Sequence, residues 1–138
     1  MWKDTTDTMI NSIFTVHIHY RKSHKMNQHM DLRVLNPSKT KAYSFALPKA
    51  RFPEGNEKML AVRTPDHSVK IMKLEGNLQN GDRLEIYDQG KCKIVMDSDD
   101  RKGFVLEGKN IKGFFIFIKR NNYGKSDTWL VFRSNKKV

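Results

Sequence analysis

The stretch FTVHIHY at residues 14–20 alternates apolar and polar side chains, and HMDLRV at residues 29–34 repeats the alternation a few positions later. Successive side chains of a β-strand point to opposite faces, so this pattern predicts two strands with one buried and one polar face each. The polar faces of the two predicted strands carry five ionisable residues: His17, His19, His29, Asp31 and Arg33.

Similar short runs recur along the chain between Gly, Asn, Asp and Pro residues, and no stretch keeps a helical period beyond a turn or two. Many short strands at regular spacing favour a closed barrel over an open sheet. We therefore predict a mainly β protein, a single small β-barrel with little helix. The predicted strands are residues 12–20, 29–35, 41–47, 58–64, 69–74, 83–88, 91–96, 103–107, 111–119 and 128–133, with a turn at 88–90 among others. The predicted core includes Met30, Leu32, Val34, Phe115, Phe117 and Trp129.

The 138 residues fit one domain, which we place at residues 13–134 between an N-terminal arm (1–12) and a C-terminal tail (135–138). The single cysteine, Cys92, forms no intramolecular disulfide, and its place in an alternating run favours a position in an ordinary half-buried strand over a role as a nucleophile. No apolar run is long enough to span a membrane and the N-terminus does not resemble a signal peptide. We expect a soluble, intracellular protein, cytoplasmic or associated with the nucleoid or nucleus, that is a monomer.

The chain has a net charge of +11, from 26 Lys and Arg against 15 Asp and Glu. A domain this basic usually binds a polyanion, because neutralising phosphates releases their condensed counterions. The charges are dispersed and form no long block, so lysines scattered over a solvated surface remain the alternative. Charge alone indicates nucleic acid without naming a substrate.

The polar faces of the first two strands would converge if these strands pair as a hairpin across residues 21–28. Two imidazoles and a carboxylate are a ligand set for Mn²⁺, Zn²⁺ or Fe²⁺, with positions left for water or phosphate. Arg33 beside them offers a planar donor for a phosphate. A strand whose polar face is simply exposed to water would carry the same pattern, and both interpretations stay open on the pattern alone.

Several motifs, in order along the chain, resemble the 3′-phosphoesterase domain of the bacterial multifunctional DNA ligase D. The likeness extends over about residues 13–134 and rests on several ordered elements together. These are Phe14-Thr15-Val16-His17-Ile18-His19, His29-Met30-Asp31-Leu32-Arg33, Ser44-Phe45-Ala46-Leu47-Pro48-Lys49, Glu57-Lys58-Met59-Leu60-Ala61-Val62 with Asp66-His67, Leu74-Glu75-Gly76, the spaced residues Leu106, Gly108, Ile111, Gly113 and Phe115, and Trp129-Leu130-Val131.

The resemblance implies a small β-barrel with a Mn²⁺ site, in which another divalent metal such as Zn²⁺ or Co²⁺ is the alternative. Carried over position by position, it implies three metal ligands: His19, His29 and Asp31. It implies catalytic roles at the scissile phosphate for Arg33, Lys49 and His67, and phosphate or substrate contacts for His17, Arg33, Lys49 and Lys58. Lys49 following Pro48 at a strand end, and His67 capping a turn, are the structural alternatives.

The sequence departs from the family pattern at several positions. His19 and His29 are ten residues apart where the family has six, which requires a four-residue insertion in the loop; without that gap, His24 would lie beside the position of the first ligand. We prefer His19, because Phe14 and Val16 hold the strand register and a hairpin loop tolerates insertion better than a strand. His17 replaces a family glutamine. Three further replacements are Met59 for an active-site arginine, Pro65 for an acidic residue and Ile71 for a tyrosine.

The resemblance implies a metal-dependent phosphoesterase that removes a 3′ ribonucleoside, a 3′-phosphate or both from DNA or RNA 3′ ends in DNA repair, with a separate ligase or polymerase as a partner. The first alternative is a non-catalytic, degenerate family member that binds DNA or RNA ends or a repair partner through a basic groove. The second is an unrelated β-barrel that binds RNA.

Overall fold

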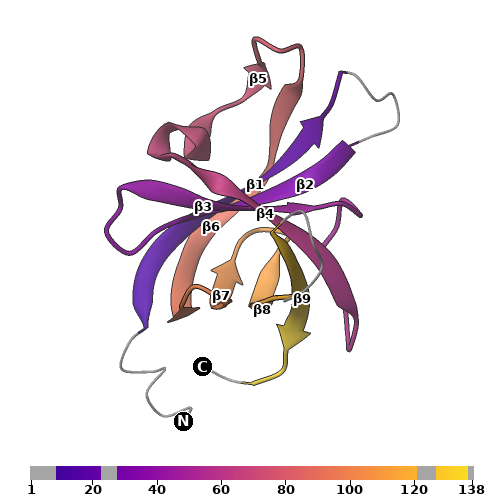
Figure 1. Cartoon of the computed structure of the whole chain (residues 1–138). Coiled ribbons are helices and arrows are strands. Elements are labelled where there is room, and N and C mark those ends of the chain that lie inside the picture. The colour runs from indigo at the N-terminus through magenta and orange to yellow at the C-terminus, as the bar shows by residue number, and fades with distance from the viewer. Residues whose placement is uncertain (1–8, 23–27, 121–126, 137–138) are drawn as a thin grey trace.

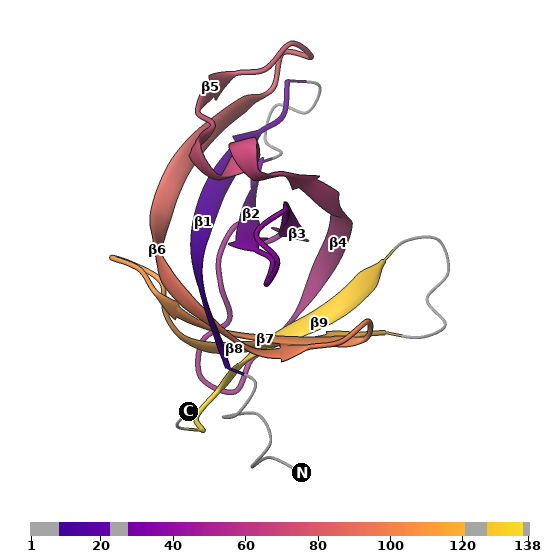
Figure 2. The ribbon, with the colours of Figure 1, turned by 90° about the vertical axis from the view of Figure 1, so that its left-hand side faces the viewer.

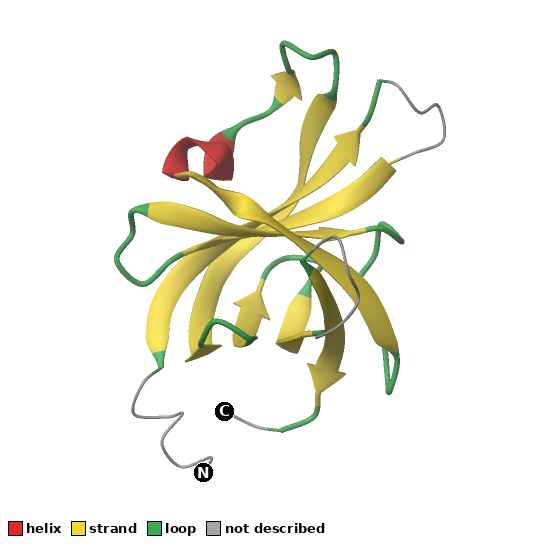
Figure 3. Ribbon diagram, viewed as in Figure 1, coloured by secondary structure: helices red, strands yellow, loops and turns green. Residues whose placement is uncertain are grey.

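The computed structural model describes residues 9–22, 28–120 and 127–136. Within them the chain forms nine strands and one short 3₁₀ helix, coloured along the chain in Figure 1 and by type in Figure 3. The strands are β1 (Ile10–Tyr20), β2 (Gln28–Leu35), β3 (Lys41–Leu47), β4 (Lys58–Ser68), β5 (Gly76–Asn77), β6 (Arg83–Asp97), β7 (Arg101–Glu107), β8 (Lys112–Lys119) and β9 (Thr128–Ser134); the helix is η1 (Val69–Lys73).

Eight strands close into an antiparallel barrel in the order β1-β2-β3-β4-β9-β8-β7-β6, and pairing of β1 with β6 completes the ring. Figure 2 shows these strands surrounding one interior. The two-residue strand β5 extends the sheet beside β6, outside the ring. Closure leaves no free edge on the barrel strands themselves. The prediction of a single β-barrel with little helix is confirmed.

The barrel interior is filled by the apolar faces that the alternation predicted. Aromatic rings dominate the centre: Phe45 lies 4.3 Å from Phe117 and 5.2 Å from Trp129 between ring centroids, the second pair edge to face. Such pairs add stabilisation beyond the area they bury. The six residues predicted for the core are all buried, which confirms that prediction: Met30, Leu32, Val34, Phe115, Phe117 and Trp129.

Cys92 lies in the interior on β6, 1% exposed. Burial, followed by the nearby charge of Glu107, raises the pKa of its thiol to about 12. A thiol that stays protonated and out of contact with solvent is a poor nucleophile. Its place on the inward face of β6 agrees with the position in a half-buried strand that the sequence favoured.

The prediction of a strand at residues 69–74 is wrong, because Val69–Lys73 forms the helix η1. Two local hydrogen bonds explain the turn: Lys70 N donates to the hydroxyl of Ser68 as an N-cap, and Leu74 N donates to the carbonyl of Ile71. The apolar residues there had suggested a strand, but only Met72 is buried. No helix in the described part of the chain is long and apolar enough to cross a membrane.

The predicted turn at residues 88–90 is also wrong, because β6 continues unbroken from Arg83 to Asp97. Gly90 explains the misleading signal. A Cβ added at this glycine would lie 2.4 Å from the carbonyl oxygen of Glu107 on the neighbouring strand, so the position requires a glycine for close backbone approach.

Asp88 anchors the loop between β7 and β8. Its buried carboxylate accepts backbone N–H bonds from Lys109, Asn110 and Ile111 at 2.6–2.9 Å, and from Gln89 at 2.9 Å. Burial by itself raises the pKa of this carboxyl, but the four N–H donors outweigh it and the pKa lies below its ordinary value. The loop therefore depends on an ionised side chain from β6.

We expect Asp88→Asn to lower the free energy of unfolding by about 1.5–3 kcal/mol, because an amide turns an N–H₂ group toward backbone donors that need an acceptor. Urea unfolding at pH 7 measures the loss. The same substitution at exposed Asp99 is the control and should change little. The depressed pKa also predicts how stability depends on pH. The contribution of Asp88 to the free energy of unfolding is present above its unfolded pKa of about 3.9, and it disappears as the pH falls through the folded pKa. Equal stability of the two variants at pH 7 would contradict this account.

Candidate metal and phosphate site

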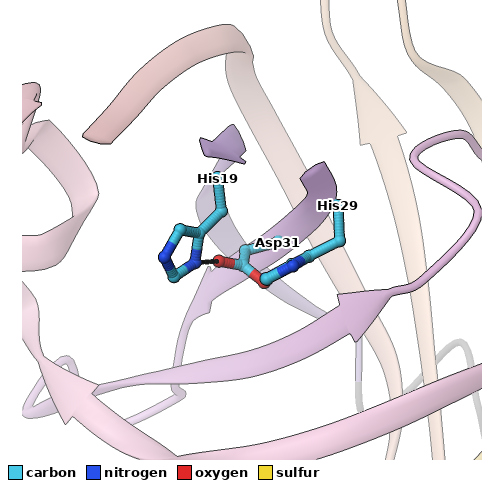
Figure 4. A group of neighbouring side chains, drawn as sticks. All are labelled: His19, His29 and Asp31. Carbon is cyan, nitrogen blue, oxygen red and sulfur yellow. Dashed lines mark hydrogen bonds and ion pairs between the residues drawn. The ribbon is translucent and has the colours of Figure 1, made fainter. Parts of the chain in front are cut away.

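The hairpin of β1 and β2 brings the polar faces of the two strands together, as predicted. In its register His17 lies opposite Asp31, and His19 lies opposite His29. Opposite residues of an antiparallel pair have their Cβ atoms about 4.5–5.5 Å apart on one face. His19, His29 and Asp31 thus form a group whose potential ligand atoms all lie within 4.8 Å of one another (Figure 4). His24, the alternative first ligand, falls outside the described residues.

The spacing of the donor atoms in this group fits a divalent cation. His19 Nδ1 lies 3.1 Å from Asp31 Oδ2, and His29 Nε2 lies 3.0 Å from Asp31 Oδ1. Two ligands each about 2.1 Å from a metal and at right angles to one another are about 3.0 Å apart. The three side chains can therefore hold a first-row divalent ion with open positions, and their donor types suit such an ion.

Asp31 is the electrostatic centre of the group. Burial alone raises its pKa, but hydrogen bonds with His19 and His29 and the charge of Arg33 outweigh burial, and the pKa lies well below its ordinary value. The hydrogen bond with Asp31 in turn raises the pKa of His19. The carboxylate is thus ionised at neutral pH, as a metal ligand must be.

Arg33 lies beside Asp31 on β2, and both side chains are 5% exposed. Its Nη2 donates to Asp31 Oδ2 at 2.9 Å, and its Nε points to Nδ1 of His17 at 3.4 Å. Burial lowers the pKa of His17, whose Nε2–H donates to the carbonyl of Leu74 at 2.8 Å. His17 is therefore neutral, with both ring nitrogens occupied, and it lies behind Arg33 rather than at the surface.

The segment of η1 and the residues after it cover part of this polar face, which the sequence did not predict. The hydroxyl of Thr15 donates to the carbonyl of Met72 at 2.7 Å, and the carbonyl of Leu74 accepts the Nε2–H of His17. The carboxylate of Glu75 accepts the backbone N–H of Ile86 at 2.9 Å. These long-range contacts keep His17 and Thr15 hydrogen-bonded although they are buried.

His67 reaches the same side of the barrel from β4. A β-bulge between β3 and β4 places it opposite Ala42, and its Nδ1 lies 3.0 Å from the hydroxyl of Ser44, which pairs with Arg33 across β2 and β3. Burial, and next the charge of Arg33, lowers the pKa of His67. The structure therefore brings His67 toward the group as a neutral imidazole.

Lys49 and Lys58 are both exposed. Lys49 is exposed two residues beyond the end of β3, and Lys58 is exposed at the start of β4, opposite Phe132. Asp31 pairs with Ala46 of β3, and Ala46 pairs with Val62 of β4. Lys58 is four residues before Val62, which corresponds to about 13 Å along the strand. In the described part of the chain neither lysine makes a hydrogen bond or ion pair with the group.

Sequence reasoning missed Asp82. It lies in the turn between β5 and β6, and its Oδ2 accepts a hydrogen bond from His19 Nε2 at 2.8 Å. Asp82 also borders a cavity lined by Arg21, Lys22 and Asn80. No local pattern in the sequence indicates that this turn reaches His19.

We expect Asp31→Ala to lower the free energy of unfolding of the metal-free protein by about 3–5 kcal/mol, because it leaves the buried guanidinium of Arg33 without its counter-charge. His29→Ala removes a half-buried ring and should cost clearly less. Chemical denaturation with a chelator present measures both. Equal losses for the two variants would show that Arg33 does not depend on Asp31.

No curated protein matches the chain. The family described as the DNA ligase D 3′-phosphoesterase domain matches residues 19–119, a span that runs from His19 to the end of β8 and contains His29, Asp31 and Arg33. This match covers most of the 138 residues. The chain belongs to the DNA ligase D 3′-phosphoesterase domain family.

Proposed function

We propose that the protein is a metal-dependent phosphoesterase that processes nucleic-acid 3′ ends, removing a terminal 3′ ribonucleoside, a 3′-phosphate or both. The observation that carries the proposal is the group of His19, His29 and Asp31, with donor atoms at metal-ligand spacing and Arg33 held against it. Family membership supports a phosphoesterase role in DNA repair.

His19, His29 and Asp31 would hold the metal, with Mn²⁺ our first choice and Zn²⁺ or Co²⁺ the alternatives. A divalent ion bound there would neutralise phosphate charge and lower the pKa of a bound water. Asp31 supplies the negative charge of the ligand set, and its depressed pKa keeps it deprotonated over the whole neutral range. The two rings would supply nitrogen ligand atoms, each about 3 Å from an oxygen of Asp31.

Arg33 is positioned before substrate arrives. Among the described residues, Asp31 and His17 engage two of its nitrogens, so Nη1 would be the group to contact a phosphate oxygen. A guanidinium fixed in this way loses little freedom when it binds, so it stabilises charge that grows in the transition state. We assign His17 the task of holding Arg33 in place, and His67 that of a neutral hydrogen-bonding group near the phosphate.

The positive net charge suits a nucleic-acid strand leading to the site. Arg21 and Lys22 lie two and three residues after His19 and line the cavity next to Asp82. Charges of this kind bind phosphates without reading sequence, so affinity should fall steeply with salt. Lys49 and Lys58 fit this outer role better than direct contact with the scissile phosphate. DNA and RNA 3′ ends are both candidate substrates, with a separate ligase or polymerase as the user of the product.

The deciding assay uses a 5′-labelled primer–template ending in one ribonucleotide, incubated with and without Mn²⁺. We expect shortened product with Mn²⁺ only, no product with His29→Ala, and at least a 100-fold lower rate with Arg33→Lys, because an ammonium cannot keep the bonds to both Asp31 and His17. Arg33→Lys should still bind Mn²⁺. Arg101→Lys, on an exposed β7 position, is the matched control and should keep full activity.

An intact 3′ terminus after incubation of the wild type with Mn²⁺, Mg²⁺, Zn²⁺ and Co²⁺ would reject the enzyme. A non-catalytic protein that binds nucleic-acid ends would then be the better account. One observation favours that second candidate: Met59 stands where the family resemblance expects an active-site arginine, and its side chain lies in the barrel core, 2% exposed.

We expect Met59→Arg to destabilise the protein by about 3 kcal/mol or more and not to raise activity, because it buries a charge in the barrel core near Arg51, whose Nη1 is 3.6 Å from Met59 Sδ. Leu60→Arg at the next, half-exposed position is the control and should cost little. Urea unfolding and the primer assay measure the two effects. A stable Met59→Arg protein with increased turnover would show that an arginine here reaches the site and that its loss limits the enzyme.

A further inference from the structure

The ring of His19 lies between two carboxylates that come from opposite sides. Asp31 Oδ2 is 3.1 Å from Nδ1, and Asp82 Oδ2 is 2.8 Å from Nε2. The His19 and Asp82 side chains are 20% and 15% exposed. His29 and Asp31 lie on the Nδ1 side, whereas Asp82 is outside the group that could share one cation. The two nitrogens of His19 thus face different partners with different chemistry.

A neutral imidazole has one N–H donor and one lone pair. Asp31 and Asp82 are both acceptors, so without a metal each ring nitrogen of His19 faces a carboxylate to which it can donate. A cation shared with His29 and Asp31 would take the place of the proton on Nδ1, and the remaining proton would stay on Nε2, facing Asp82. Histidine ligands of metals commonly donate their second ring N–H to a carboxylate, which holds the tautomer and the ring orientation and increases ligand basicity. The bond between His19 and Asp82 has this form.

Asp82 is itself held in place by its turn. Its Oδ1 accepts the backbone N–H of Lys22 at 3.1 Å, and its own N–H donates to the side chain of Asn80 at 2.9 Å. Its carbonyl accepts the N–H of Leu78 at 2.7 Å, and Gly81 takes a positive φ of 92° before it. One of these bonds holds the carboxylate and two hold the backbone of Asp82, so the side chain can keep the ring of His19 in one orientation.

We propose that Asp82 is a positioning residue for the metal site, holding His19 as the Nε2–H tautomer so that Nδ1 is the metal-binding atom. The residue is 63 positions from His19 in the chain and belongs to none of the motifs carried over from the family resemblance. The inference rests on the proposed function only in taking His19, His29 and Asp31 as a metal site. The proposal specifies Nδ1 as the metal-binding atom of His19, and it assigns a role to the turn between β5 and β6.

The first arm measures Mn²⁺ and Zn²⁺ affinity by calorimetry on the full chain without nucleic acid. We expect Asp82→Ala to weaken binding about 10- to 100-fold, Asp82→Asn to fall between it and the wild type because an amide oxygen still accepts the N–H, and Asp82→Glu to restore part of the loss. Glu85→Gln is the matched control: it removes an exposed carboxylate three residues away, and should leave affinity unchanged.

The second arm reads the tautomer directly. Proton–nitrogen correlation spectra of the Zn²⁺-loaded, ¹⁵N-labelled protein should show His19 with a proton on Nε2 and the metal on Nδ1, and the Nε2–H signal should shift in Asp82→Asn. A purely structural role for Asp82 would not produce that signature. Metal on Nε2 of His19 would overturn the proposal.

Two other outcomes would also overturn it. One is equal affinity of Asp82→Asn, Asp82→Ala and wild type, which would leave the metal site standing and reject only the role of Asp82. The other is a loss in the free energy of unfolding of metal-free Asp82→Asn that equals its loss in the free energy of metal binding, which would assign Asp82 to folding of the turn. A wild type that binds neither Mn²⁺ nor Zn²⁺ would instead reject the metal site and the proposed function with it.

Discussion

Antiparallel pairing of β1 with two neighbours is the constraint on which the fold and the site both depend. One edge of β1 pairs with β2 and the other with β6, and this second pairing closes the barrel. With both edges engaged, the strand cannot slip by one residue without moving its apolar side chains out of the core. The register that buries Phe14 and Val16 is therefore the register that sets His19 opposite His29.

The polar face of β1 and β2 is unusual because it is nearly as buried as the apolar one. His17, Asp31 and Arg33 are each less than 5% exposed, yet all three are hydrogen-bonded. Burying such groups without partners would be strongly destabilising. The covering segment after β4 supplies partners for β1, and Asp31 supplies the counter-charge for Arg33. The same bonds that make burial tolerable fix the orientation of the guanidinium, so they would also preorganise it for the proposed contact with a phosphate.

Three of the residues that depart from the family pattern lie either in the barrel core or at its covered polar face. The replacement at Met59 points inward and becomes part of the apolar packing, and Ile71 lies in the helix η1 that covers the polar face. His17, which replaces a glutamine, is accommodated behind Arg33 through a carbonyl of the covering segment. His19, His29 and Asp31 still lie together, with potential ligand atoms within 4.8 Å of one another. The changes therefore affect what surrounds the candidate metal ligands more than the ligands themselves.

The sequence by itself predicted most of the strands and the buried and polar faces of the first two, and with the family resemblance it predicted that His19, His29 and Asp31 meet. These follow from a two-residue period and from a hairpin, both of which depend on neighbours close in the chain. The structure alone decided that residues 69–73 form a helix, that β6 runs through residues 88–90, that His17 lies behind Arg33 and that Asp82 reaches His19. Each of these depends on contacts with distant parts of the chain: Leu74 is 57 positions from His17, and Asp82 is 63 positions from His19. Only closure of the barrel brings such residues together, and no local pattern records which partner a buried polar group will find.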